Sequence, residues 1–296
     1  MSYSSGLLKH PCAINNGFMR GIRYFGNTGP EYKGKIILCD KPKYSLCRKS
    51  VEIADYEDKF CILLDGKLLS TPFGNDIVTH SRELANHIKL EWEAQIDKLT
   101  RFGTVPLTLL LSRTLDFSDY SKGTHIVDLL DSLQTDTLLF YERCEPIDLP
   151  DLGSLSEDVL SQIRPLDLKV LQSSIINRLL DLFATHFRLE PIVISDTISK
   201  CPVQSDATLK VLHNTLYSLE NPHIITVLHL QKCLKSLILP LMLIHKMVTP
   251  TDALRASRLE ETLEAANWGV NDEFKATEDL IMKEIHTCLL FLTYMH

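Results

Sequence analysis

The sequence predicts an α+β fold in which a small β-rich N-terminal domain precedes a mainly α-helical C-terminal domain. Before Thr79, short runs of β-branched and aromatic residues alternate with turn residues, as in strands. After Thr79, apolar residues recur at helical spacing. The 296 residues, 45% of them hydrophobic, can bury a sizeable core. We therefore expect a β-rich domain over residues 36–100 and a helical domain over residues 101–296.

Residues 1–35 differ in composition from the rest of the chain. The stretch before Glu31 contains three basic residues and no acidic residue, and its apolar residues are interrupted by Pro11 and Gly17. A secretory signal needs a continuous apolar core, whereas a basic, acid-free segment is typical of an organelle transit peptide. We interpret residues 1–35 as an organelle transit peptide, with a disordered tail as the alternative.

The β-rich part is predicted from short strands and one strong turn signal. Strands are expected over residues 36–39, 51–54, 60–64, 67–69 and 77–78. Asp65 and Gly66 stand between two of these runs, and Asp-Gly is a preferred pair for a type I′ hairpin turn, which needs positive φ at both positions. We assign Asp65 and Gly66 a structural role in this turn.

The helical part begins at Ser81, a residue suited to cap a helix. Trp92 lies on the apolar stripe of this helix, so we interpret it as a core residue. Ser154 and Glu157 have capping-box spacing, and Pro165 suits the first turn of a long helix. Further helices are expected over residues 107–115, 126–133, 165–187 and from about residues 206, 222, 250 and 272, with a lone strand at residues 192–195.

One predicted helix of the C-terminal region carries a cluster of acidic residues. Thr249 and Pro250 predict its start and Gly269 its end. Three glutamates would then fall in its second half, where the helix dipole favours cations: Glu260, Glu261 and Glu264. Residues 252–284 hold nine acidic and four basic residues. Such a cluster indicates a partner surface, with a solvated helix face as the alternative.

Several classes of function find no support in the sequence. We find no glycine-rich phosphate loop, dinucleotide fingerprint, nucleophile elbow or metalloprotease helix, so we predict no enzyme, cofactor or metal site. A net charge of -7 disfavours nucleic acid as a partner. The most apolar stretch, residues 234–248, is shorter than the roughly 20 residues of a membrane span, so we expect a buried helix and no membrane insertion.

The chain resembles a known family from about residue 60 to residue 272: the mitochondrial and bacterial chaperones for the ATP synthase alpha subunit. The resemblance rests on short motifs that follow one another in the family's order. They are Leu64-Asp65-Gly66-Lys67 with Thr71-Pro72, Glu91-Trp92 with Gln95, Pro106-Leu107-Thr108 leading to Asp116, Thr135-Asp136 before Leu138-Leu139 and Tyr141, Leu234-Lys235-Ser236, Ser257-Arg258-Leu259-Glu260-Glu261, and Trp268-Gly269. The chain departs from the family's pattern at Val105, where methionine is usual, and at Glu264, where glutamine is usual.

The resemblance implies a protein of the mitochondrial matrix that binds the unassembled alpha subunit without a cofactor. It implies a partner surface around Glu260 and Glu261, to which we add Arg258 and Glu264, while Trp268 and Gly269 are expected to be structural. Two rival functions stay open at this point. One is an enzyme whose site is built from residues distant in sequence, and the other is a permanent structural subunit of a mitochondrial complex.

Overall fold

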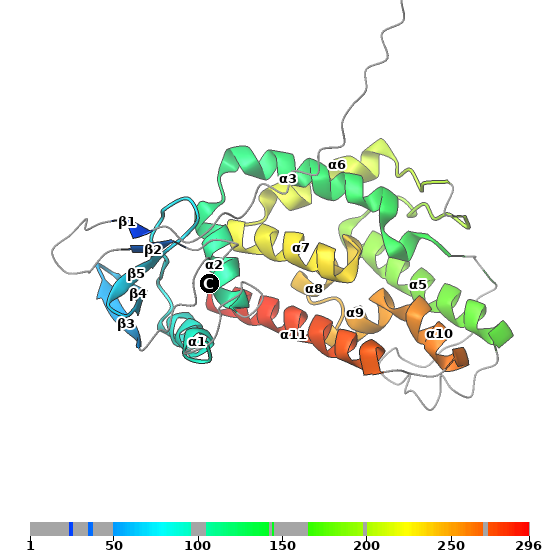
Figure 1. Ribbon diagram of the computed structural model, residues 1–296. Coiled ribbons are helices and arrows are strands. Elements are labelled where there is room, and N and C mark those ends of the chain that lie inside the picture. The colour runs from blue at the N-terminus through cyan, green and yellow to red at the C-terminus, as the bar shows by residue number, and fades with distance from the viewer. Residues whose placement is uncertain are drawn as a thin grey trace, which may run out of the picture.

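The computed structural model describes residues 24–25, 35–37, 50–95, 105–141, 144, 165–197, 200–268 and 272–295. Over these residues a β-sheet lies at one end of an elongated helical body (Figure 1). The predicted α+β class is therefore confirmed. The boundary that we predicted near residue 100 falls in residues 96–104, outside the described residues.

The sheet has six strands and mixed topology. Its strands are β1 (Tyr24–Phe25), β2 (Lys35–Ile37), β3 (Val51–Tyr56), β4 (Lys59–Leu64), β5 (Lys67–Ser70) and β6 (Val78–Thr79). The order is β1-β2-β5-β4-β3, β6 pairs with β4, and all pairs are antiparallel except β2 with β5. Strand β1 lies within residues 1–35, the predicted transit peptide, while residues 1–23 lie outside the described part.

The β4–β5 hairpin forms at the predicted Asp-Gly pair. Leu64 pairs with Lys67, and the two residues between them have φ values of 52° at Asp65 and 72° at Gly66. Positive φ at both positions matches a type I′ turn, whose twist fits the twist of the strands it joins. The Asp65 carboxylate also accepts a hydrogen bond from the Ser50 backbone N–H at 2.9 Å.

The helical body is built from helices that begin at capping side chains. Ser81 accepts from the Leu84 N–H at 3.1 Å at the start of α1, and Ser205 accepts from the Thr208 N–H at 3.2 Å at the start of α6. The helices are α1 (Arg82–Glu93), α2 (Pro106–Asp116), α3 (Asp119–Ser132), α5 (Pro165–Phe187), α6 (Asp206–Ser218), α7 (Asn221–Leu234), α8 (Ile238–Ile244), α9 (Pro250–Ser257), α10 (Leu259–Trp268) and α11 (Asp272–Tyr294), with short 3-10 turns η2 (Leu133–Thr135) and η3 (Thr137–Leu139).

One large core connects the sheet with the helices. It runs from Ile62 and Leu64 of β4, through Trp92 of α1 and Leu110 of α2, to Phe291 of α11. Helix α1 packs on β3 and β4 and also contacts α2 and α11. Figure 1 shows α1 and α2 between the sheet and the rest of the body, and α11 running back so that the chain ends near them. The predicted core role of Trp92 agrees with its 2% exposure.

Three expected elements differ from the structure. Residues 192–195 do not form the expected strand; of these residues, Ser195 forms an isolated β-bridge with Phe140. Helix α3 begins seven residues before the expected start, because Ser118 and Ser121 form a capping box. The helix predicted from Pro250 to Gly269 is divided at Arg258 into α9 and α10.

Within the apolar stretch at residues 234–248, residues 238–244 form the short helix α8. Its residues from Ile238 to Met242 are fully buried. None of the helices in the described ranges has the length and apolar character that crossing a membrane requires.

Candidate partner-binding site

Residues from motifs that are distant in sequence form three hydrogen-bonded groups in the structure. The first group joins the turn after β5 to the end of α2. Thr71, which is fully buried, donates from its hydroxyl to Oδ1 of Asp116, and the Asn75 side chain donates to the same oxygen at 2.8 Å. This group fixes one corner of the sheet against the helical body.

Glu91 forms the second group and joins α1 to the start of α2. Val105, at the N-cap of α2, has an apolar side chain that cannot accept a hydrogen bond. The Glu91 carboxylate takes over this role, because it accepts from the N–H groups of Leu107 at 2.7 Å and Thr108 at 3.1 Å. The Thr108 hydroxyl donates to Glu91 at 3.1 Å and accepts from Trp92 Nε1 at 3.0 Å. Burial, partly offset by these hydrogen bonds, raises the pKa of Glu91 to about 7.

Asp136 forms the third group and joins η3 to the start of α8. Its side chain is buried and accepts from the Leu138 N–H at 3.0 Å. The other carboxylate oxygen accepts from the Ser236 hydroxyl at 2.9 Å and from the Leu237 N–H at 2.7 Å. Burial raises the pKa of Asp136 to about 6. The Thr135-Asp136 and Lys235-Ser236 motifs therefore form one structural unit.

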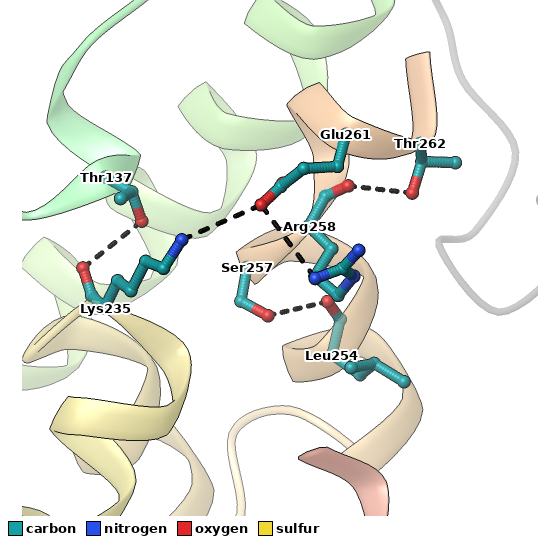
Figure 2. A network of polar contacts seen from close by, with 7 residues as sticks. All are labelled: Thr137, Lys235, Leu254, Ser257, Arg258, Glu261 and Thr262. Carbon is teal, nitrogen blue, oxygen red and sulfur yellow. Dashed lines mark hydrogen bonds and ion pairs between the residues drawn. The ribbon is translucent and has the colours of Figure 1, made fainter. Parts of the chain in front are cut away.

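Next to this unit lies a surface that we call the charged corner, formed by Thr137, Lys235, Arg258, Glu260 and Glu261. Nζ of Lys235 and Nη1 of Arg258 each lie 3.9 Å from Oε1 of Glu261. Figure 2 shows the Glu261 carboxylate pointing between the two cations, with α10 on one side and the end of α7 on the other. The corner thus brings together three segments: the start of η3, the α7–α8 junction and the α9–α10 junction.

Arg258 is the interior residue of the charged corner. Its side chain is only 11% exposed, and its guanidinium lies 4.6 Å from the centre of the Phe274 ring. Its carbonyl accepts from the Thr262 N–H at 2.8 Å, which starts α10. Nε of Arg258 is buried and has no hydrogen-bond partner among the described residues. Arg258 thus lies mostly buried at the base of the corner, and its predicted role as a partner contact stays a prediction.

The helix break at Arg258 overturns one of our electrostatic arguments. Glu260 and Glu261 lie in the first turn of α10, where the positive end of the helix dipole favours carboxylates. They do not lie in the second half of a longer helix, so these two glutamates do not oppose the dipole of their own helix. Glu260 is exposed, and the Glu261 side chain is 37% exposed. The side chains of Glu264 and Trp268, and all of Gly269, lie outside the described residues.

Two arrangements of polar residues could not be predicted from the sequence. Lys235 belongs to a recognised motif, but its contact with Glu261 depends on how α7 and α10 pack. The second arrangement joins α2, α7 and α11: His229 Nε2 lies 2.7 Å from Glu284, and His229 Nδ1 lies 3.4 Å from Arg113. The hydrogen bond with His229 lowers the pKa of Glu284. These residues are 55 and 116 positions apart, so no local spacing could reveal the contact.

Within the described ranges, no group of three or more His, Cys, Asp or Glu side chains is arranged to hold a metal ion. His229 and Glu284 lie between helices, with side chains 16% and 22% exposed. We interpret this pair, with Arg113, as a structural contact between α2, α7 and α11.

Comparisons with known proteins support a family assignment. The family model described as "ATP12 chaperone protein" matches residues 47–184. This range includes the hairpin and the residues bonded to Glu91 and Thr71, as well as Asp136 and Thr137. A relative in Schizosaccharomyces pombe, "Protein atp12, mitochondrial", is 36% identical over 88 residues, which are 27% of this chain and 29% of the relative.

Two solved structures share the fold. The crystal structure of Atp12 from Paracoccus denitrificans has a TM-score of 0.63 and 24% identity, covering 84% of this chain and 97% of that one. The Atu1473 protein from Agrobacterium tumefaciens has a TM-score of 0.63 and 22% identity, covering 82% of this chain and 84% of that one. The family model and the relative in Schizosaccharomyces pombe thus make parts of this chain similar to ATP12 chaperones, and the solved structures show that the chain shares their fold.

Proposed function

We propose that this protein is an assembly chaperone of the mitochondrial ATP synthase. It binds the unassembled alpha subunit of the catalytic head and prevents its aggregation until that subunit joins the beta subunit. The observation that carries the proposal is the match of residues 47–184 to a family of chaperones. The yeast relative is named as mitochondrial, which supports an organellar location, and we place this protein in the matrix.

The mechanism is binding, without chemical turnover. A subunit that has lost its neighbour exposes apolar surface that is normally buried, and such surface promotes aggregation. The chaperone covers this surface, and complementary charge at the rim of the contact favours the correct partner over others. Release occurs when the true neighbour competes for the same surface, so the chaperone needs neither ATP nor a catalytic group.

The charged corner supports this function by its geometry. Glu260 is exposed at the start of α10, and Glu261 is held next to it by two cations. Both glutamates lie in the first turn of α10, where the helix dipole favours negative charge, so the corner offers two acidic side chains to a basic partner group. Arg258 holds α10 in place through its carbonyl and its contact with Phe274. We therefore propose Glu260 and Glu261 as direct contacts of the alpha subunit and Arg258 as the residue that positions them.

The test measures aggregation of purified alpha subunit by light scattering, with and without this protein. We expect wild-type protein to suppress scattering and the E260K/E261K variant to lose most of this effect. The matched control is D128K/D131K, which makes the same charge change at two exposed positions of α3. The control should act like wild type, because α3 carries no part of the charged corner.

The outcomes separate the proposal from its rivals. Unchanged scattering with wild-type protein at equimolar or higher ratio contradicts the chaperone function. Equal loss in both charge-reversal variants contradicts the role of the charged corner, because only net charge would then matter. Co-purification with the complete ATP synthase at fixed stoichiometry would identify a permanent subunit instead.

A further inference from the structure

Lys235 occupies a backbone conformation that favours glycine. It ends α7 with φ at 53°, in the left-handed region, where a side chain costs free energy relative to glycine. Lys246, Arg188, Asp65 and Glu57 also have positive φ, so this conformation alone does not indicate a function. Lys235 is distinguished by how firmly its backbone is held and by what its side chain faces.

The backbone on both sides of Lys235 is fixed by hydrogen bonds. Its carbonyl accepts from the Thr137 N–H at 3.2 Å and from the Thr137 hydroxyl at 3.3 Å. The next two residues, Ser236 and Leu237, donate to the buried Asp136 carboxylate at 2.9 and 2.7 Å. The position of the Lys235 Cα is therefore fixed, and binding sites need side chains that are held in place in this way.

The ion pair of Lys235 is loose and exposed. The Lys235 side chain is 68% exposed, and the 3.9 Å separation from Glu261 is longer than the roughly 2.7–2.9 Å of a charge-assisted hydrogen bond. Exposed pairs of this kind contribute little to stability. Neither group satisfies the other fully, so each keeps hydrogen-bonding capacity for an external group. Figure 2 shows Lys235 and Arg258 on opposite sides of Glu261.

We propose that Lys235 is a second partner contact of the charged corner and determines its specificity. This inference rests on the proposed chaperone function. The corner then recognises a segment of the alpha subunit that carries a basic side chain beside an acidic one. Glu260 and Glu261 take the basic group, and Lys235 takes the acidic group.

Such a site discriminates between partners by both signs of charge. A uniformly basic surface would be attracted by the glutamates but repelled by Lys235, so it would bind less well than a mixed segment. In the free chaperone, Lys235 and Glu261 partly neutralise each other. Their pair forms again when the partner leaves, which offsets part of the electrostatic cost of release and suits a chaperone that must hand over its client.

The decisive variant is Lys235→Gly, because glycine removes the side chain while favouring the observed backbone conformation. Lys246→Gly is the matched control: Lys246 is also an exposed lysine with positive φ, at 57°, just beyond the end of α8. Both variants should keep or raise the melting temperature. In binding to purified alpha subunit, K235G should be weaker by roughly tenfold, whereas K246G should equal wild type.

Two further variants replace Lys235 by another long side chain. K235R should recover most of the binding, because it restores the cation, and K235Q should bind as weakly as K235G. Binding by K235G within about twofold of wild type, or an equal loss in K246G, would overturn the assignment of Lys235. Failure of the wild-type protein to bind alpha subunit would instead refute the proposed function, and the role of Lys235 with it.

Discussion

Two carboxylates, the half-buried Glu91 and the buried Asp136, connect the recognised motifs to one another. Each accepts backbone N–H groups at the start of another helix, α2 for Glu91 and α8 for Asp136. A carboxylate that accepts several such bonds replaces the side-chain cap that these helices lack. Burial nevertheless raises the pKa of both groups, to about 7 for Glu91 and about 6 for Asp136. The two carboxylates in these motifs therefore serve primarily to hold the starts of α2 and α8 in place.

The raised pKa of Glu91 predicts a pH dependence of stability. Its pKa moves from 4.5 to about 7 on folding, so the folded state favours the protonated form. The stabilisation from this shift is complete below about pH 4.5 and is lost as the pH rises through about 7, with a slope of at most about 1.4 kcal/mol per pH unit. Relative to Glu91→Gln, the wild-type protein should become less stable across this window.

Urea unfolding of both proteins at a series of pH values measures this difference. Glu93→Gln is the control, because Glu93 lies on the same helix and its side chain is 39% exposed. The free energy of unfolding of E93Q should change with pH in the same way as that of the wild-type protein. Parallel profiles for wild type and E91Q would show that Glu91 has no raised pKa in the folded protein.

Among the single elements, the β4–β5 hairpin holds a glycine with positive φ, whereas helix α3 holds a glycine in ordinary helical conformation. Gly66 has φ at 72°, a conformation that a side chain disfavours. Gly123 lies inside α3, and a Cβ added there would meet nothing within 4 Å. The same substitution to alanine should therefore have opposite effects at the two positions.

We expect Gly66→Ala to lower the free energy of unfolding by about 1 kcal/mol and Gly123→Ala to raise it by about 0.5–1 kcal/mol. The first variant strains the type I′ turn, whereas the second restricts the unfolded chain and favours the helix. Chemical denaturation compared with wild type measures both values. Destabilisation of similar size in both variants would contradict the assigned difference in backbone conformation.

At the scale of the whole molecule, the sheet and the helices share one core. Helix α1 packs on β4 and contacts α2 and α11, and α2 in turn packs against α7 and α11. The regions that we predicted as two domains, residues 36–100 and 101–296, are therefore joined by apolar packing. A continuous core favours unfolding in a single cooperative step.

Denaturation followed by two probes tests this cooperativity. The chain has two tryptophans, so Trp268→Phe leaves Trp92, in the core between α1 and α2, as the one tryptophan whose fluorescence is followed. Its fluorescence and the far-ultraviolet circular dichroism of the helices should change at the same urea concentration. Separate midpoints would show that the sheet with α1 unfolds independently of the helical body.

Much of the fold could be predicted because it depends on residues close together in sequence. The Asp65-Gly66 turn, the cap at Ser81, the proline at the start of α5 and the buried position of Trp92 all follow from local spacing and backbone preference. The start of α3 was missed because a serine pair in a capping box is a weaker signal than the apolar residues that follow it. Such local rules do not depend on the rest of the molecule.

The candidate site was only partly predictable, since its geometry depends on contacts across the chain. Local sequence was enough to predict the α+β class, the hairpin, most helices and the presence of charged residues near Glu260 and Glu261. The tertiary structure decided that the predicted helix is divided at Arg258, that Arg258 packs on Phe274, and that Lys235 faces Glu261. The physical reason is distance along the chain: turn and helix propensities act over a few residues, whereas the meeting of η3, α7 and α10 depends on how the whole core packs.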